Sequence, residues 1–362
     1  MTPVKNETVM KRQPATGKGR LHFLDQFRGF ALLGLPFVNV LALWLIATPE
    51  TSADFWLQRV LTFFVEARFY TIFTFLFGLG FYMFLSRSAV AGGKPRLRLY
   101  IRRLAILVLI GFIHQHYQSG EALFHYAIVG LLALPLYWAP RRVNLGIGVV
   151  GFTVAAVMGV KLLTIPFLIL LGLAAGQYRL HEAISKGIRW SKLRMVWLLS
   201  LLGTVIAIGA MWWAAPPEPM PPFLFMIEGE SPSSTMQAAL TLAHIGVATG
   251  PIVSAFYLSS LLLLGCTRLG ARILYPLQAY GRMALTNYIG QTVFLVGIQR
   301  FILNTTPTTY VVSTFVSLGI VVCQIIASNL WMRWFQYGPL EWLWRCGTYW
   351  TIVPIRKKAG NL

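Results

Sequence analysis

Three polar residues fall on one face of the first long apolar segment of the chain. Asp25 and Arg28 are three residues apart, and Asn39 follows Arg28 by eleven. At about 100° per residue, a helix places Asn39 about 20° from Arg28 and Asp25 about 60° from it. At about 1.5 Å per residue, Asn39 lies roughly 16 Å beyond Arg28. The stripe predicts either a binding path into a membrane domain, or an Asp–Arg pair with an amide that bonds to another helix.

A second stripe repeats this spacing and ends in a group suited to acid–base chemistry. Arg103 and His114 are eleven residues apart, and Glu121 follows a Ser119-Gly120 pair that should end the helix. Glu121 would then lie in the first turn of the next helix, where the dipole favours a carboxylate. A neutral His oriented by a carboxylate can act as a general base near neutral pH. We therefore predict His114 and Glu121 as the catalytic pair; the alternative is a buried, satisfied His beside a helix-capping Glu.

A third polar group lies toward the C-terminus. Asn287 and Gln291 are four residues apart, so both face the same side of a helix, and Arg282 precedes them by about one turn. Two amides in an apolar segment require partners inside a bundle. The predicted binding residues are Asp25, Arg28, Asn39, Arg102, Arg103, Arg282, Asn287 and Gln291.

Neither a metal site nor a redox motif is predicted. Cys266, Cys323 and Cys346 show no CxxC spacing. His114 and His116 are two residues apart and would point about 200° away from each other on a helix, so they are not a helical metal pair. We expect no bound cofactor.

The elements that position these residues are apolar helices long enough to suggest a membrane. The chain has 362 residues, of which 56% are hydrophobic and only 12% charged, which excludes a water-soluble globule, a coiled coil and a disordered chain. We predict an all-α, polytopic bundle of about ten transmembrane helices, with nine or eleven crossings as alternatives. The expected spans are 29–47, 69–86, 104–118, 122–138, 145–160, 163–178, 195–214, 248–265, 284–302 and 310–332.

The distribution of basic residues predicts the orientation of this bundle. Of the 31 Lys and Arg residues, all fall in alternate connections except Arg59, Arg68, Lys161 and Arg300. Cytoplasmic loops retain Lys and Arg, so both termini should lie in the cytoplasm. The net charge of +20 is thus explained by topology and by anionic membrane lipids, and no nucleic-acid partner is expected.

Local composition predicts how the rest of the chain is divided. Residues 1–24 should form a mobile basic tail, 25–335 the membrane domain, and 336–362 a cytoplasmic tail. Residues 51–68 should form an amphipathic helix on the membrane surface. The Pro-rich stretch 215–236 should be irregular.

Several strings carry a resemblance to a known family. They are DQFRG at 25–29, TIFTFLFGLG at 71–80, GFIH at 111–114, YGRMALTNY at 280–288 and GPLEWLWR at 338–345. The last two fall in the 248–345 part of the chain. Together they resemble the YeiB-type family of multi-pass bacterial inner-membrane proteins, defined by a domain of unknown function, DUF418, along nearly the whole chain.

The family in turn resembles a group of enzymes, and this second resemblance implies a function. The family is similar to transmembrane acyltransferases, which carry acyl groups from cytosolic acyl-CoA to extracytoplasmic sugars; the shared feature is the first-span Asp-x-x-Arg-Gly stretch. Where acyltransferase-3 proteins usually carry a His eleven residues after that Arg, this chain has Asn39. If acyl transfer occurs, His114 is the matched base, and acyl-CoA would be the co-substrate and a small molecule or glycan the acceptor. The alternative is a transporter or flippase of a small or lipidic solute.

Overall fold

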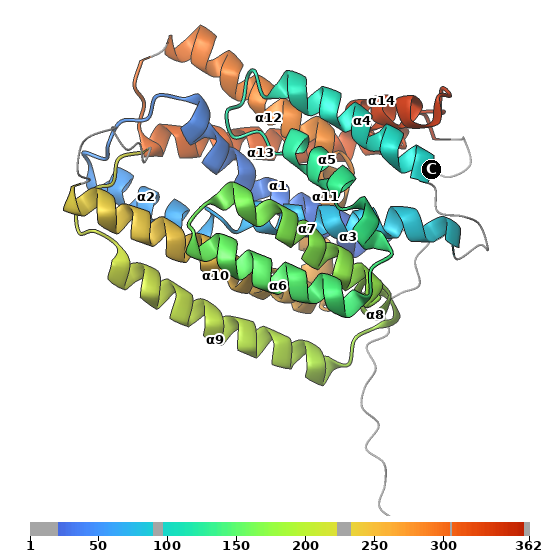
Figure 1. Cartoon of the computed structure of the whole chain (residues 1–362). Coiled ribbons are helices and arrows are strands. Elements are labelled where there is room, and N and C mark those ends of the chain that lie inside the picture. The colour runs from blue at the N-terminus through green and yellow to red at the C-terminus, as the bar shows by residue number, and fades with distance from the viewer. Residues whose placement is uncertain (1–20, 90–96, 223–232, 305, 358–362) are drawn as a thin grey trace, which may run out of the picture.

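The chain folds as a helical bundle in a computed structural model that describes residues 21–89, 97–222, 233–304 and 306–357. Its long helices run side by side, with α8 and α14 at one end and α2 at the other (Figure 1). The helices are α1 (His22–Leu43), α2 (Ser52–Phe64), α3 (Phe69–Ala89), α4 (Leu97–His114), α5 (Leu123–Leu132), η1 (Leu134–Tyr137), α6 (Arg141–Val157), α7 (Lys161–Gln177), α8 (Leu180–Lys186), α9 (Trp190–Ala214), α10 (Ser234–Leu264), α11 (Arg268–Arg282), α12 (Ala284–Ile298), η2 (Gln299–Leu303), α13 (Tyr310–Trp334) and α14 (Pro339–Tyr349).

The all-helical fold is confirmed for the described residues, and each of the ten predicted apolar segments contains a helix. Runs of apolar residues become helices because a helix satisfies its own backbone hydrogen bonds, which lipid cannot do. The predicted amphipathic helix over 51–68 is α2, which Thr51 caps by accepting the Asp54 N–H. Most of the predicted basic tail, residues 1–20, lies outside the described residues; α1 already includes residues 22–24 of it.

The structure adds helices that a search for apolar runs did not predict. The segment 268–282, expected to be a loop, is α11, and part of the expected C-terminal tail is α14. Both are amphipathic, so their apolar residues are spaced along one face and form no continuous run. Helix α10 begins at Ser234, whose neighbour Ser233 caps it, rather than at 248. The predicted irregular stretch 215–236 is therefore helical at its end.

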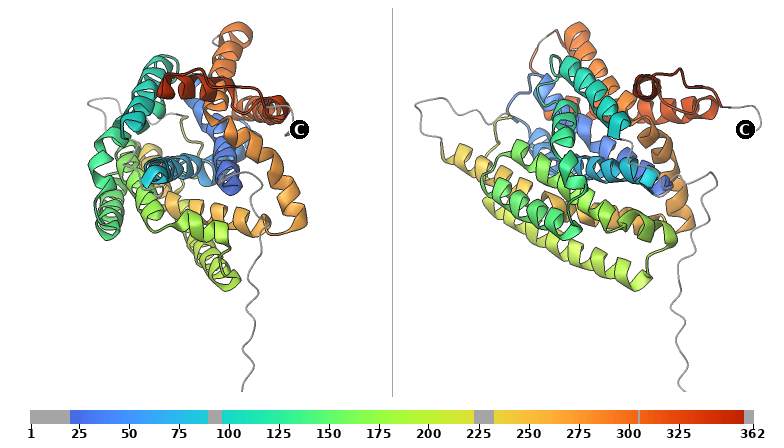
Figure 2. Two further views of the ribbon diagram at one scale, coloured as in Figure 1. Left: turned by 90° about the vertical axis from the view of Figure 1, so that its right-hand side faces the viewer. Right: turned by 45° about the vertical axis from the view of Figure 1, so that its right-hand side comes forward.

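Two helices show that the bundle is apolar on its outside. In α2, Asp54, Gln58 and Arg59 are buried, whereas Trp56 is 53% exposed. In α9, Ser200 and Thr204 are buried and the surrounding Leu and Val side chains are exposed. Helix α9 lies at the edge of the bundle (Figure 2). A polar inner face with an apolar outer face suits a protein surrounded by lipid.

Five of the described helical segments are long and apolar enough to cross a membrane, or six if the bent pair α7–α8 is counted as one span. They are His22–Leu43, Ser52–Ser86, Trp190–Ala214, Ser234–Leu264 and Tyr310–Trp334. The pair α7–α8 bends by 52° at its break. The remaining apolar helices are shorter than a single crossing of the hydrocarbon core usually needs.

Glycines allow the central helices to approach each other closely. A side chain at Gly78 of α3 would collide with the Ile169 carbonyl of α7, and one at Gly172 of α7 would collide with the Phe75 carbonyl. Small residues at helix contacts are typical of membrane bundles. Gly78 of the FLFGLGF string therefore serves helix packing. On its other sides α3 contacts α1 and α4, with which it encloses the cavity described below.

Candidate functional site

A cavity of about 930 Å³ opens between α1, α3, α4, α11, α12 and α14, a volume at the upper end of the range for small-molecule sites. Most of its wall is apolar or aromatic. These wall residues include Phe73, Leu76, Phe77, Phe81, Phe84, Tyr100, Leu104 and Leu107. The side chain of Arg28 at its rim keeps 35% exposure, so the cavity is reachable from outside the bundle.

Four arginines line the cavity, and two carboxylates oppose them. The arginines are Arg28, Arg103, Arg282 and Arg345, and the carboxylates are Asp25 and Glu341. Both carboxylates are already engaged by the protein. Asp25 is 3.3 Å from Arg28, and Glu341 accepts hydrogen bonds from the start of α12. The cavity therefore carries a net positive charge in an apolar surround, where it favours anionic ligands.

Aromatic rings orient two of these arginines. The Arg103 guanidinium lies 3.8 Å from the centroid of the Trp344 ring and 5.3 Å from that of Phe84. Arg345 lies 4.4 Å from the Tyr337 ring centroid. Stacking of this kind holds the planar guanidinium in place while its N–H groups stay available for phosphate or carboxylate.

Glu341 attaches α14 to the start of α12, beside the cavity. Its carboxylate accepts hydrogen bonds from the backbone N–H groups of Leu285 and Thr286 at 2.6 and 3.1 Å, and from the Thr286 hydroxyl at 2.6 Å. These are the unpaired donors of a helix N-terminus, where a carboxylate is favourable. Burial nevertheless raises the pKa of the Glu341 carboxyl above its usual value, against the hydrogen bonds that lower it. The contact fixes Trp344 and Arg345 against the cavity.

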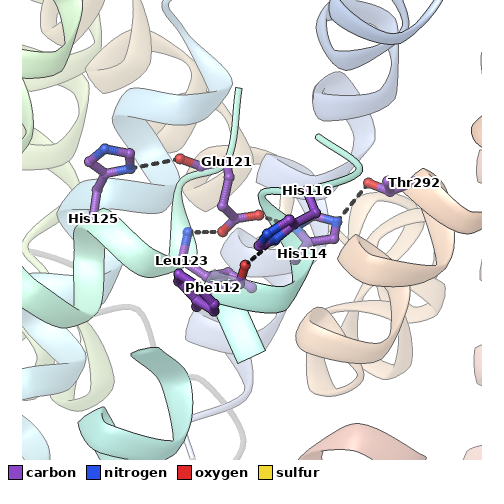
Figure 3. A network of polar contacts seen from close by, with 7 residues as sticks. All are labelled: Phe112, His114, His116, Glu121, Leu123, His125 and Thr292. Carbon is purple, nitrogen blue, oxygen red and sulfur yellow. Dashed lines mark hydrogen bonds and ion pairs between the residues drawn. The ribbon is translucent and has the colours of Figure 1, made fainter. Parts of the chain in front are cut away.

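His114 and Glu121 meet inside the bundle, as Figure 3 shows. His114 Nδ1 pairs with Glu121 Oε2, and His114 Nε2 lies 2.9 Å from the Thr292 hydroxyl. Glu121 Oε1 accepts the backbone N–H of Leu123. His114 and Glu121 are each 5% exposed. Helix α4 ends at His114 itself, and the turns over 115–120 bring the predicted pair into direct contact, with α12 supplying a third partner.

The two neighbouring histidines do not join this pair. His116 is exposed and contacts the Phe112 carbonyl at 2.8 Å. His125 Nδ1 is 2.8 Å from the backbone carbonyl of Glu121 and does not contact its carboxylate (Figure 3). Among the described residues, no group of three His, Cys, Asp or Glu side chains is arranged to hold a metal ion.

Tyr288 connects the cavity with the buried pair. Its side chain lines the cavity, and its ring centroid is 5.2 Å from that of His114. His114 and Glu121 are not part of the cavity wall. A ligand in the cavity therefore meets the pair through Tyr288 and Leu123.

The predicted binding residues separate into two groups. Asp25, Arg28, Arg103 and Arg282 line the cavity, whereas Asn39, Arg102, Asn287 and Gln291 do not. Arg102 is exposed and lies 5.0 Å from the Trp350 ring centroid. Asn39 is half-buried on α1, and its Nδ2 has no hydrogen-bond partner in the described structure.

Asn287 and Gln291 belong to a network that joins helices. Asn287 Nδ2 donates to the Tyr280 carbonyl and to Ser328, each at 3.0 Å. Gln291 Nε2 donates to the Tyr280 hydroxyl at 2.9 Å, and Gln324 Nε2 donates to the Asn287 carbonyl at 3.0 Å. These contacts tie α12 to α11 and α13. They fit the expectation that two amides in an apolar helix require partners in the bundle.

Arg345, Glu341 and Tyr288 are among the cavity residues that were missing from the predicted site. Arg345 and Glu341 lie in the GPLEWLWR string, and Tyr288 ends the YGRMALTNY string. Both strings carried the family resemblance, so the sequence did mark these residues. They were missed because residues 336–362, which include α14, were expected to form a tail outside the bundle. A site predicted from all of the family strings together would have included these three residues.

The arrangement defines a helical protein with several apolar, membrane-length helices and a basic cavity that ends beside a buried His–Glu pair. The family model for a protein of unknown function (DUF418) matches residues 175–351. An uncharacterized 39.9 kDa protein in the amylase 3' region of Bacillus acidopullulyticus is 41% identical over 340 residues, which cover 94% of this chain and 96% of that protein. The chain belongs to the YeiB-like DUF418 family.

Two further relatives cover almost the same length. The uncharacterized protein YxaH of Bacillus subtilis is 26% identical, over 96% of this chain and 98% of its own. The uncharacterized protein YeiB of Escherichia coli is 27% identical, over 93% and 98% respectively.

Proposed function

We propose that this protein is a membrane acyltransferase, which binds acyl-CoA from the cytosol in the cavity and passes its acyl group to an extracytoplasmic acceptor. The observation that carries the proposal is the composition of the cavity. It has four arginines and an apolar wall that leads to Tyr288, next to the His114–Glu121 pair. A CoA thioester is divided in the same way as the cavity. Its phosphates, at one end, would match the arginines, and its acyl group, at the other end, would match the apolar wall.

The arginines would hold the phosphates by charge-assisted hydrogen bonds. Arg103 and Arg345, oriented by aromatic rings, are the residues best placed for this, because their ring contacts leave the N–H edges of the guanidinium groups available. The apolar wall would take the acyl chain and the less polar part of the CoA arm. Trp344 and Tyr349 of α14 would cover the complex.

The His114–Glu121 pair would supply the general base. The acceptor hydroxyl or amine gives up its proton to His114, a bond forms from the acceptor to the carbonyl carbon, and the C–S bond breaks. The proton then passes to the CoA sulfur. Glu121 holds the imidazole by Nδ1 and would stabilise its protonated form. This step needs a rearrangement of Thr292, which occupies His114 Nε2 in the resting protein.

The proposal includes the finer topology. Ten crossings with both termini in the cytoplasm place the arginine end of the cavity on the cytoplasmic side of a bacterial inner membrane. The charge distribution supports this orientation. The short helices α5, α6 and α7 would then cross as parts of tilted or broken spans.

Thermal-shift binding on the detergent-purified protein tests the proposal. Acetyl-CoA or palmitoyl-CoA should raise the melting temperature by mass action. Inorganic phosphate at the same concentration should not do so, because it lacks the acyl arm. If no CoA thioester stabilises the protein, acyl transfer is overturned and transport of another solute becomes the better hypothesis.

A further inference from the structure

The cavity and the His114–Glu121 pair do not touch each other directly, and two residues lie between them. Leu123 lines the cavity and gives its backbone N–H to Glu121 Oε1. Tyr288 lines the cavity, and its ring centroid is 5.2 Å from that of His114. Only Tyr288 of these two brings a polar side-chain group to the boundary. Its hydroxyl is therefore the polar side-chain group that lies between the cavity and the buried pair.

We propose that Tyr288 is a catalytic residue whose hydroxyl donates a hydrogen bond to the thioester carbonyl of the bound acyl group. This inference rests on the proposed function, because it requires an acyl-CoA in the cavity. The hydroxyl would stabilise the negative charge that develops on the carbonyl oxygen as the acceptor attacks. Tyr288 neither gains nor loses a proton; the acceptor proton goes to His114 and then to the CoA sulfur.

The buried Glu121 carboxylate does not depend on Tyr288 for its hydrogen bonds. Glu121 Oε2 pairs with His114, and Oε1 accepts the Leu123 N–H. The Tyr288 hydroxyl can therefore donate to a substrate carbonyl without leaving a buried carboxylate unsatisfied.

Contacts of the three residues before it fix the position of Tyr288 on α12. The backbone N–H groups of Leu285 and Thr286 donate to Glu341. The preceding residue, Asn287, is bonded to Tyr280 and Ser328. A donor that stabilises a transition state must be held in place before the reaction starts. These contacts provide that rigidity at the end of the cavity.

Isotope-edited infrared spectroscopy of bound acyl-CoA tests this assignment. The purified protein is loaded with acetyl-CoA or palmitoyl-CoA carrying ¹³C at the thioester carbonyl, and the carbonyl band is compared with that of the free thioester. In the wild type, a hydrogen bond from Tyr288 should move the band to lower frequency. Tyr288→Phe keeps the ring against His114 and should return the band to its unbonded position. Release of free CoA thiol, with water or an added acceptor, should fall by about 10²–10³-fold.

Tyr126→Phe is the matched control. Tyr126 is buried on the neighbouring helix α5, bonds to Thr74 at 2.6 Å and does not line the cavity. The same loss of a buried hydroxyl there should leave the carbonyl band shifted. A shift that persists in Tyr288→Phe overturns the role of Tyr288 while leaving acyl-CoA binding intact. An unshifted band in the bound wild type overturns it without any variant, and a protein that binds no acyl-CoA overturns the proposed function instead.

Discussion

The Trp344 indole holds Arg103 by two contacts at once. Its ring centroid is 3.8 Å from the guanidinium carbon, and its Nε1–H donates to the Arg103 backbone carbonyl at 2.8 Å. Helix α14 is thereby joined to α4 across the cavity. The adjacent Arg102 is exposed and lies against Trp350 instead. The two arginines have the same charge and differ in whether they reach the cavity.

This difference gives the first prediction. Arg103→Gln should weaken CoA binding by about 10-fold or more, since a hydrogen bond to a charged group contributes about 1.5–3 kcal/mol. Arg102→Gln should leave the affinity unchanged, because Arg102 lies outside the cavity. Isothermal titration with CoA measures both. Equal losses in the two variants would show that bulk charge, and not the cavity, binds CoA.

A second prediction concerns the volume of the cavity. A Cβ added at Gly80, which lines the cavity, would lie in ordinary contact 3.6 Å from the Arg28 guanidinium. Gly80→Leu should therefore be tolerated and should project into the cavity, which would abolish binding of acyl-CoA. Gly146→Leu is the control, because Gly146 is exposed on α6 with nothing within 4 Å of an added Cβ. Normal binding by a folded Gly80→Leu variant would place the ligand elsewhere.

The buried pair should show strong coupling. His114→Gln or Glu121→Gln alone leaves one partner of a buried pair without its match, which typically costs about 3–5 kcal/mol. The double variant should be less destabilised than the sum of the two singles, with a coupling energy of roughly 0.5–3 kcal/mol. Denaturant unfolding in detergent followed by tryptophan fluorescence measures the cycle. Additive effects would mean that the contact between the two side chains contributes nothing.

The contact of Glu341 with α12 predicts a pH-dependent stability. Burial raises the pKa of the Glu341 carboxyl, so the folded state binds its proton more tightly than the unfolded state does. The resulting stabilisation is fully present below the ordinary pKa of 4.5 and is lost as the pH rises through the higher folded value. Glu341→Gln lacks this titration. The melting temperature of the wild type should therefore rise relative to the variant as the pH is lowered from 7 toward 5, and a constant difference would contradict the shift.

Topology can be tested with single cysteines in a background where Cys266, Cys323 and Cys346 are replaced by Ser. In the proposed ten-span arrangement, Ser185→Cys on α8 lies in the cytoplasm, whereas Thr235→Cys at the start of α10 lies outside. A membrane-impermeant maleimide added to intact cells should label only the second. Labelling of Ser185→Cys would show that the orientation is opposite to the proposed one, with the arginine end of the cavity on the outer side of the membrane.

Local features of the site followed from the sequence because they depend on short distances along the chain. Helix α4 ends at His114, before the expected Ser119-Gly120 pair, and the turns over 115–120 bring Glu121 back toward His114 within seven residues. Helix periodicity likewise placed Asp25 beside Arg28, and the structure has them 3.3 Å apart. The partner of His114 on α12, Thr292, is 178 residues away in the chain and no periodic pattern indicated it.

The sequence by itself determined the helical class and the ten apolar segments, because both depend on the polarity of neighbouring residues along one helix. Only the tertiary structure decided which polar groups share a space. It brought Arg345 and Glu341 of α14 to the cavity, turned Arg102 away, and placed Asn287 and Gln291 in contacts between helices. The physical reason is that periodicity fixes the direction of a side chain about its own helix axis. Which neighbour covers that face depends on how distant helices pack.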